Sequence, residues 1–148
     1  LIGNNFYHPM NKGRKGAQRL FDGNIGLIYP DFISKNATNR IIADAKYKPL
    51  GNIGNKDYLQ VLAYMFRFDA KKGLYLYPEN GKVENQLLKM NRGLTYEDNV
   101  EPRTDIQIIK CGLKIPIVAK DYDEFKCKIK TSERAFINQL KMNLEQIT

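Results

Sequence analysis

The sequence predicts an α/β or α+β fold in which helices flank a mixed β-sheet. Short runs rich in β-branched and aromatic residues recur along the chain, and a segment with helical periodicity separates two of them. A strand, a helix and a following strand of these lengths favour a right-handed crossover between parallel neighbours. A hairpin earlier in the chain would add an antiparallel pair, so we expect a sheet with both kinds of pairing.

The first strands are expected in a β-hairpin. Residues 25–34 and 40–47 are the two strand-like runs, and the polar residues 35–39 between them are typical of a turn. Pro30 lies inside the first run, where it cannot donate a ladder hydrogen bond. We therefore expect a bulge or a sheet edge at Pro30.

A helix and two further strands follow the hairpin. Residues 57–68 predict a largely buried helix with Asp57 as its N-cap. Residues 74–77 predict a short strand that ends at Pro78, and residues 104–111 alternate as another strand.

The last part of the chain is expected to end in a helix. Residues 113–119 either continue the preceding strand or pair with it. Thr131 or Ser132 is a suitable cap for the closing helix. Its apolar stripe is Phe136, Ile137, Leu140, Leu144 and Ile147.

Length and composition indicate a single domain over residues 1–148. The chain has 148 residues, 43% of them apolar, which is enough for a core without disulfides or a structural metal. No apolar run approaches the roughly 20 residues that span a bilayer, so we expect no membrane association. Two cysteines and no signal peptide favour reduced thiols and a cytoplasmic location. Because residue 1 is Leu, we expect this domain to be the carboxyl-terminal part of a longer chain.

The charge of the chain is compatible with nucleic-acid binding. Lys and Arg number 24 against 16 Asp and Glu, a net charge of +8. Such a field attracts polyanions, although a solvated basic surface is the alternative. Residues 1–18 are turn-rich and expected to be irregular. They contain the basic run Lys12, Arg14 and Lys15, which either follows a DNA backbone or belongs to a solvated tail.

Three acidic or basic residues lie at corresponding places on the two hairpin strands. Asp31 follows Pro30 on the first strand, and Asp44 and Lys46 lie two apart on the second, so the latter two share a face. Asp31 can face them across the hairpin. Two converging carboxylates repel each other unless a hard divalent cation such as Mg²⁺ binds between them. The pattern therefore predicts a metal site.

This set of residues suits phosphodiester hydrolysis. A carboxylate-bound Mg²⁺ can activate water, stabilise the phosphate and assist the leaving oxygen. The Lys46 ammonium would orient the nucleophile or offset charge in the transition state. Gln60 and Tyr64, one helical turn apart, would support the metal shell or hold the DNA backbone near Lys46.

The order of these motifs resembles the PD-(D/E)XK nuclease superfamily, which has a restriction-endonuclease-like core. The runs LIYPDFIS, RIIADAKYK, DYLQVLAYMFRF and GLYLYP are similar to the nuclease region of McrC-like subunits of McrBC-type modification-dependent restriction systems. The resemblance covers about residues 19–78. Residues 79–148 resemble the family more loosely and support the fold only.

The resemblance implies a role for each motif residue. Asp31 and Asp44 would be metal ligands, with the Ala45 carbonyl as a third, and Lys46 would be the catalytic lysine. The helix pair matches the accessory motif, and Mn²⁺ would substitute for Mg²⁺. The partners would be DNA and an AAA+ GTPase of the McrB type. One departure is that many members carry an acidic residue on a helix before the first motif, whereas the only earlier acid here is Asp22.

Other interpretations remain open at this stage. Asp44 and Lys46 would form a plain salt bridge on a half-buried strand if the motif were accidental. Lys48 either contacts phosphate or is an exposed edge lysine. The same fold also serves repair or recombination nucleases, and a catalytically silent nucleic-acid-binding module is a second alternative.

Overall fold

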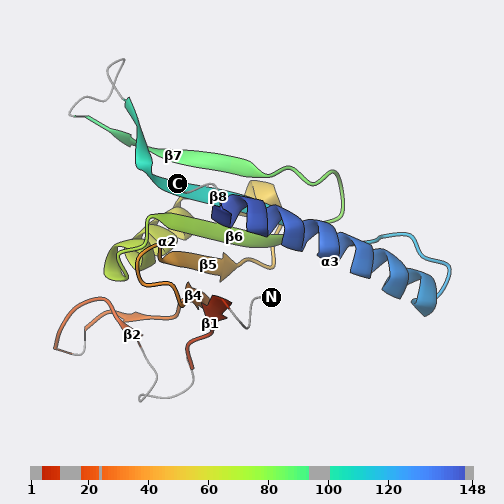
Figure 1. Cartoon of the computed structure of the whole chain (residues 1–148), viewed down its shortest axis with the longest axis horizontal. Coiled ribbons are helices and arrows are strands. Elements are labelled where there is room, and N and C mark those ends of the chain that lie inside the picture. The colour runs from red at the N-terminus through yellow and green to blue at the C-terminus, as the bar shows by residue number, and fades with distance from the viewer. Residues whose placement is uncertain (1–4, 11–17, 24, 94–100, 146–148) are drawn as a thin grey trace.

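The computed structural model has an α+β architecture in which helices flank a six-stranded mixed sheet (Figure 1). It describes residues 5–10, 18–23, 25–93 and 101–145, with no account of the side chains of residues 144 and 145. The strands of the main sheet, in spatial order, are β1 (Phe6–Tyr7), β4 (Phe32–Ser34), β5 (Ile41–Ala45), β6 (Lys72–Glu79), β8 (Glu101–Lys114) and β7 (Gln86–Arg92).

The centre of the sheet is parallel and its outer pairs are antiparallel. β4 pairs with β5 antiparallel, β5 with β6 and β6 with β8 parallel, and β7 with β8 antiparallel. The crossover from β5 to β6 contains the short 3₁₀ helix η1 (Leu50–Asn52) and α2 (Asn55–Arg67). The predicted mixed sheet and the parallel neighbours around a helix are therefore confirmed.

The two long helices pack on opposite faces of the sheet. α2 packs against residues such as Ile42 and Tyr75, whereas α3 (Tyr122–Glu145) packs through Leu140 against Ala43 and Leu74. Alternate residues of β5 and β6 thus belong to two separate core clusters, as the pleat of a strand requires. Figure 1 shows α3 crossing the near side of the sheet, with its amino-terminal half extending past the strands.

Close contact between α2 and the sheet depends on a glycine. A Cβ at Gly73 of β6 would lie 2.7 Å from Met65 Sδ and 2.8 Å from Val61 Cγ1, both on α2. Real Cβ atoms are not found so close to other heavy atoms, so a larger residue would push the helix outward. The depth at which α2 sits, and with it the position of its polar face, is set in part by Gly73.

The predicted strand over residues 25–34 is interrupted at Pro30. Its first part forms β3 (Leu27–Ile28), which pairs with β2 (Gln18–Arg19) in a separate two-stranded sheet. Only its second part, β4, forms the expected hairpin with β5. Pro30, which has no N–H to donate, lies in the irregular segment between β3 and β4 and not in a bulge.

The prediction that residues 1–18 are irregular is wrong in two places. Phe6 and Tyr7 form β1 and pair with Ser34 and Ile33 of β4, and Gln18 belongs to β2. Strands of two residues are too short to leave a periodic signal in the sequence, because their pairing depends on a partner already in the sheet.

The beginning and the burial of α2 also differ from the prediction. The helix begins at Asn55 with Gly54 as its N-cap, so Asp57 is the third helical residue and not the cap. Its carboxylate accepts the Gly54 N–H at 3.0 Å, as the acid of a capping box does. Leu59 and Phe66 are 68% and 88% exposed, so α2 buries only one face.

The later elements are longer than predicted. β6 continues through Pro78, which is tolerated because β5 pairs only as far as Leu76 and leaves that edge open. β8 extends to residues 101–114, and residues 115–119 form no regular structure.

The strand β7 was not predicted, and α3 begins nine residues before Thr131. The cap signal at the true start is Asp121, whose Oδ1 accepts the Glu124 N–H at 2.8 Å. Of the predicted stripe, Phe136 and Leu140 meet the sheet. The side chains of Leu144 and Ile147 lie outside the described residues.

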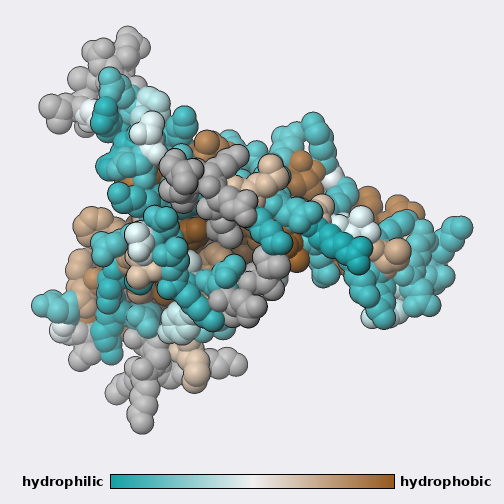
Figure 2. All heavy atoms as spheres, viewed as in Figure 1, coloured by the Kyte–Doolittle hydropathy of each residue, from teal (hydrophilic) through white to brown (hydrophobic). Residues whose placement is uncertain are grey.

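The surface in view in Figure 2 is mostly hydrophilic, in agreement with the net charge of +8. None of the helices in the described part of the chain is both long and apolar enough to cross a membrane.

Candidate functional site

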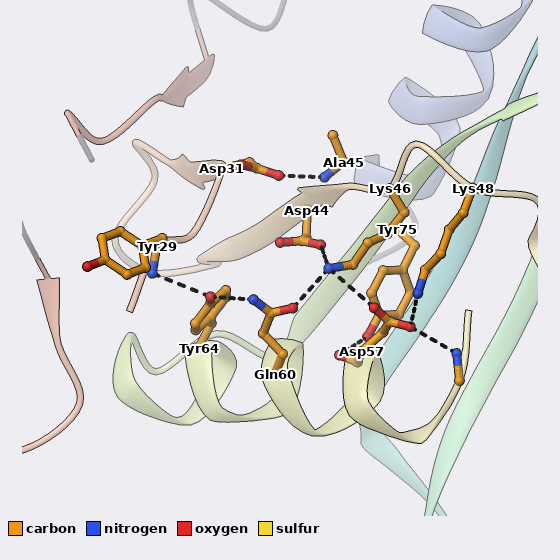
Figure 3. Close-up of polar contacts among 11 residues, drawn as sticks. Tyr29, Asp31, Asp44, Ala45, Lys46, Lys48, Asp57, Gln60, Tyr64 and Tyr75 are labelled. Carbon is orange, nitrogen blue, oxygen red and sulfur yellow. Dashed lines mark hydrogen bonds and ion pairs between the residues drawn. The ribbon is translucent and has the colours of Figure 1, made fainter. Parts of the chain in front are cut away.

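The acidic and basic residues of the two predicted motifs meet at the carboxyl end of β5, on the face covered by α2 (Figure 3). Asp44 follows Ile42 on the α2 side of the strand. Lys46 comes directly after the strand, and its backbone N–H still donates to the Leu76 carbonyl at 2.8 Å. The parallel neighbour β6 therefore fixes the backbone of both motif residues.

Asp31 reaches the same place from the break before β4. Its Oδ2 accepts the backbone N–H of Ala45 at 2.8 Å, which ties the loop after Pro30 to the end of β5. His8 lies against this loop, with Nδ1 2.5 Å from the Asp31 carbonyl oxygen. The contact of His8 is with the backbone, so the imidazole does not compete for the carboxylate.

Asp44 is a buried carboxylate whose lost hydration is poorly replaced by hydrogen bonds from the described residues. It is 3% exposed, and its Oδ2 lies 2.6 Å from Lys46 Nζ but accepts no hydrogen bond of normal angular geometry from the described residues. Burial raises the pKa of Asp44; Lys46 opposes this shift, and the negative charges of Asp31 and Asp57 add to it. The ionised form of Asp44 is thus destabilised in the folded protein.

The Lys46 ammonium contacts three oxygen atoms. Its Nζ lies 2.6 Å from Asp44 Oδ2, 2.9 Å from Gln60 Oε1 and 3.4 Å from Asp57 Oδ1. Burial acts to lower the pKa of Lys46, but the hydrogen bond and charge of Asp44, together with the charge of Asp57, outweigh it and raise the pKa. The amine is therefore a cation at neutral pH and acts as a donor of charge and hydrogen bonds.

The structure brings the predicted helix pair to this lysine. Gln60 accepts from Lys46 through Oε1 and donates through Nε2 to the Tyr64 hydroxyl oxygen at 2.8 Å. The Tyr64 hydroxyl also receives the Tyr29 N–H at 3.4 Å. Tyr64 is 3% exposed, so the pair forms an inner hydrogen-bonded row from the loop before Asp31 to Lys46.

Asp57 is a site residue that we did not predict. Its Oδ2 lies 2.6 Å from Lys48 Nζ, and its Oδ1 faces Lys46. Burial acts to raise the pKa of Asp57, but hydrogen bonds from Lys48 and the Gly54 N–H, with the charge of Lys46, lower it overall. Asp57, Gln60 and Tyr64 have the spacing i, i+3, i+7 of one helix face, and that spacing is the signal that could have revealed Asp57.

The first turn of α2 is held to the sheet by two tyrosines. The fully buried Tyr75 donates its hydroxyl hydrogen to the Asp57 carbonyl at 2.5 Å. The Tyr58 hydroxyl donates to the Ile53 carbonyl at 2.9 Å and accepts from the buried Lys110 at 2.7 Å. These contacts fix the place from which Asp57 approaches Lys46.

The predicted DNA-contacting residues are placed only in part. Lys48 is 36% exposed at its side chain and is paired with Asp57, so it does not extend freely into solvent. The basic residues Lys12, Arg14 and Lys15 lie outside the described residues.

The donor set of the site fits a hard divalent cation. Asp44 offers a buried oxygen that lacks a hydrogen bond, and the carboxylate of Asp31 uses only Oδ2, for the Ala45 N–H, among its contacts with described residues. No group of three His, Cys, Asp or Glu side chains suitable for a metal occurs among the described residues. A cation here would be held by two carboxylates, a backbone carbonyl and water, which suits Mg²⁺ because it retains several waters.

Comparison with protein-family models finds no match for this chain, and comparison with curated proteins finds no significantly similar sequence. The functional interpretation therefore depends on the geometry and charge of the residues above. Most of these residues meet at the Lys46 ammonium, which lies between β5 and α2.

Proposed function

We propose that this chain is the nuclease domain of a Mg²⁺-dependent DNA endonuclease of the PD-(D/E)XK type. The single observation that best supports the proposal is the buried carboxylate of Asp44 beside the charged Lys46, with Asp31 fixed to the adjacent backbone of Ala45. An accidental salt bridge on a surface strand would be exposed, whereas Asp44 is 3% exposed and has a raised pKa. Perturbed groups of this kind concentrate at functional sites.

The architecture is compatible with this class of enzyme. The hairpin β4–β5 carries both acidic residues, and the crossover helix α2 that follows carries Gln60 and Tyr64 on the face that meets the hairpin. The motifs by which residues 19–78 resemble the PD-(D/E)XK superfamily lie on these same elements, and membership of that superfamily is part of the proposal. A restriction-endonuclease-like core is therefore part of the proposal.

The carboxylates of Asp31 and Asp44, with the Ala45 carbonyl, would hold the cation. When bound, Mg²⁺ supplies activation of the attacking water and offsets the charge of the scissile phosphate. Asp31 is kept in position by the Ala45 N–H, so its carboxylate does not need to be ordered when the cation enters. Mn²⁺ is expected to substitute for Mg²⁺ because it accepts the same oxygen ligands.

Lys46 would act on the substrate as a fixed cation. Its pKa is raised, so the amine stays charged and can donate hydrogen bonds to a phosphate oxygen or to the attacking water. A positive charge already fixed in a partly buried place stabilises developing negative charge without reorganisation during the reaction. Gln60 and Tyr64 would keep this ammonium oriented through the row of hydrogen bonds to Tyr29.

We extend the proposal to a biological role because the motif runs resemble those of McrC-like subunits. In that role the chain would be the cytoplasmic cleavage subunit of an McrBC-type restriction system, with an McrB-like AAA+ GTPase that recognises modified DNA. Lys48 and the run Lys12, Arg14 and Lys15 would contribute to contacts with the DNA backbone. These contacts would act through charge and would weaken as the salt concentration rises.

A cleavage assay tests the activity. The full chain with its GTPase partner, GTP and Mg²⁺ is incubated with methylated or unmethylated plasmid, and Asp44→Ala and Lys46→Ala are compared with wild type. The expected result is cutting by wild type only, and none in EDTA. Lys82→Ala is the matched control, because Lys82 also forms an ion pair but is 86% exposed at its side chain.

The same assay separates the alternatives. A catalytically silent DNA-binding module would bind plasmid without cutting it, whether or not metal is present. A repair or recombination nuclease would cut without regard to methylation and without the GTPase. Equal cutting by wild type, Asp44→Ala and Lys46→Ala would overturn the site assignment.

A further inference from the structure

We infer that Asp57 is a positioning residue that retains the Lys46 ammonium in the site when a divalent cation binds Asp44. The inference rests on the proposed function, because it concerns the same metal site. It adds a third carboxylate to that site, one that contacts Lys46 and is not itself a metal ligand.

Lys46 and a divalent cation would compete for one oxygen atom of Asp44. Lys46 Nζ lies 2.6 Å from Asp44 Oδ2, the buried oxygen that accepts no hydrogen bond of normal geometry from the described residues. A divalent cation that needs the Asp44 carboxylate would meet this ammonium at close range. Two positive charges in such a partly buried place repel strongly, so the ammonium must move away from Asp44 for the cation to bind.

Among the described residues, the oxygen atoms other than Asp44 Oδ2 that contact the ammonium belong to side chains of α2. Gln60 Oε1 lies 2.9 Å from Nζ and Asp57 Oδ1 lies 3.4 Å from it, one helical turn apart on the same face (Figure 3). The Lys46 side chain is 15% exposed, so water alone does not compensate its charge. Gln60 is neutral, and Asp57 therefore supplies the negative charge that Lys46 needs once Asp44 is occupied.

Asp57 is held in the orientation that this role requires. Its Oδ2 is used by Lys48 at 2.6 Å and by the Gly54 N–H at 3.0 Å, which leaves Oδ1 directed at Lys46. Its carbonyl accepts the Tyr75 hydroxyl from the sheet. The carboxylate is thus fixed by two contacts that do not involve Lys46, and the backbone of Asp57 by a third, so the carboxylate remains in place when the ammonium moves.

This arrangement gives Lys48 a second role beside the proposed contact with the DNA backbone. The Lys48 ammonium offsets the charge on Asp57 Oδ2. Asp57 can then hold Lys46 through Oδ1 without drawing the divalent cation away from Asp44. The simpler interpretation is that Asp57 is only the acidic member of a capping box. The two interpretations differ in what happens to metal affinity when the charge of Asp57 is removed.

Mn²⁺ affinity, measured by electron paramagnetic resonance without DNA, distinguishes them. Asp57→Asn keeps an oxygen that can accept the Gly54 N–H but removes the charge, so Lys46 would remain on Asp44 and compete with the metal. We expect Mn²⁺ affinity to fall about 10- to 100-fold, as when outer-shell partners of metal ligands are removed. In a Lys46→Met background the competitor is absent, so Asp57→Asn should leave Mn²⁺ affinity unchanged.

If Asp57 only caps the helix, a different combination of stability and Mn²⁺ affinity is expected. Asp57→Asn would then lower the thermal stability and leave Mn²⁺ affinity as in wild type, or would weaken it equally with and without Lys46. Either result overturns the inference. Asp44→Ala distinguishes failure of the proposed metal site from failure of the positioning role of Asp57. Mn²⁺ binding that is unaffected by Asp44→Ala contradicts the metal site itself.

A measurement on the wild-type chain covers the case in which Asp57→Asn does not fold. In a crystal structure of the full chain with Mn²⁺, Lys46 Nζ should lie nearer to Asp57 Oδ1 than to Asp44 Oδ2, the reverse of the order of 3.4 and 2.6 Å found here. An ammonium still in contact with Asp44 Oδ2 beside a bound Mn²⁺ would contradict the inference.

Discussion

The backbone N–H of Ala45 donates to Asp31 Oδ2 at 2.8 Å, and this bond joins the two motifs of the site across 14 residues of chain. It fixes one carboxylate against the strand that carries the other. The bond lies at the end of β5, where antiparallel pairing with β4 has already stopped at Ala43. A side chain thus continues the contact that the backbone ladder no longer makes.

The first prediction separates the structural part of Asp31 from its part in metal binding. Asp31→Asn retains an oxygen that can accept the Ala45 N–H, whereas Asp31→Ala leaves that N–H without its partner. We expect Asp31→Ala to lose about 1 kcal/mol of unfolding free energy and Asp31→Asn clearly less. Mn²⁺ binding should be lost in both variants. Urea denaturation and Mn²⁺ titration of the same samples provide the two measurements, and retained Mn²⁺ binding in Asp31→Asn would contradict the ligand assignment.

The second prediction is that the charge of Asp44 lowers the unfolding free energy of the protein when no metal is bound. Because burial raises the folded-state pKa of Asp44 above its ordinary value of 3.8, the ionised carboxylate destabilises the fold at neutral pH. Asp44→Asn removes this charge and should raise the unfolding free energy at pH 7 in EDTA, by about 0.5–2 kcal/mol. The gain should shrink as the pH falls through the raised pKa, since wild-type Asp44 is then neutral. A less stable Asp44→Asn at pH 7 would count against this account.

The third prediction is that removing the charge of Asp57, unlike that of Asp44, lowers the unfolding free energy. Its folded-state pKa is lowered from 3.8, so its charge contributes stability above that value and loses the contribution as the pH falls through the lowered pKa. Asp57→Asn should therefore lose about 1.5–3 kcal/mol of unfolding free energy at pH 7, the range for hydrogen bonds to charged groups. Chemical denaturation at pH 7 and below pH 3 gives the comparison, and a penalty of equal size at both pH values would be the contrary result.

The fourth prediction tests whether Gln60 supports Lys46. Gln60→Leu removes both the acceptor for Lys46 and the donor to Tyr64 while keeping a side chain of similar size. We expect DNA cleavage to fall about 10- to 100-fold. Mn²⁺ affinity should change little, because the neutral amide neither ligates the metal nor supplies the negative charge that holds Lys46 away from Asp44. Tyr64→Phe is the companion variant: it removes only the hydroxyl at the end of the row and should have a smaller effect on cleavage.

Much of the central part of the fold follows from local sequence patterns. The hairpin strand that becomes β5, the crossover helix and the parallel strand β6 are each long enough to leave a periodic signal. The edge strand β7 does not: its residues 86–92 are mostly exposed and polar, and only pairing with β8 makes them a strand. The start of α3 at Tyr122 was missed although Tyr122, Phe125 and Ile129 have helical spacing, because most residues of the first turns are charged and exposed.

The candidate site could be predicted as a set of residue types but not as a network. Spacing on a strand places Asp44 and Lys46 on one face, and helical spacing places Gln60 beside Tyr64. The contact between Lys46 and Gln60 depends on the depth at which α2 packs, which Gly73 helps to set. Asp57 was assigned to the helix cap because local sequence does not reveal that a helix end will approach a lysine from another element.

Crystals of the full chain grown with Mn²⁺ and measured at a wavelength where manganese scatters anomalously would give the most direct test of the account. We expect an anomalous peak bonded by carboxylate oxygens of both Asp31 and Asp44, at about the 2.0–2.1 Å that Mg²⁺ takes. A Mn²⁺ bound elsewhere in the chain, with no peak between these two carboxylates, would contradict it.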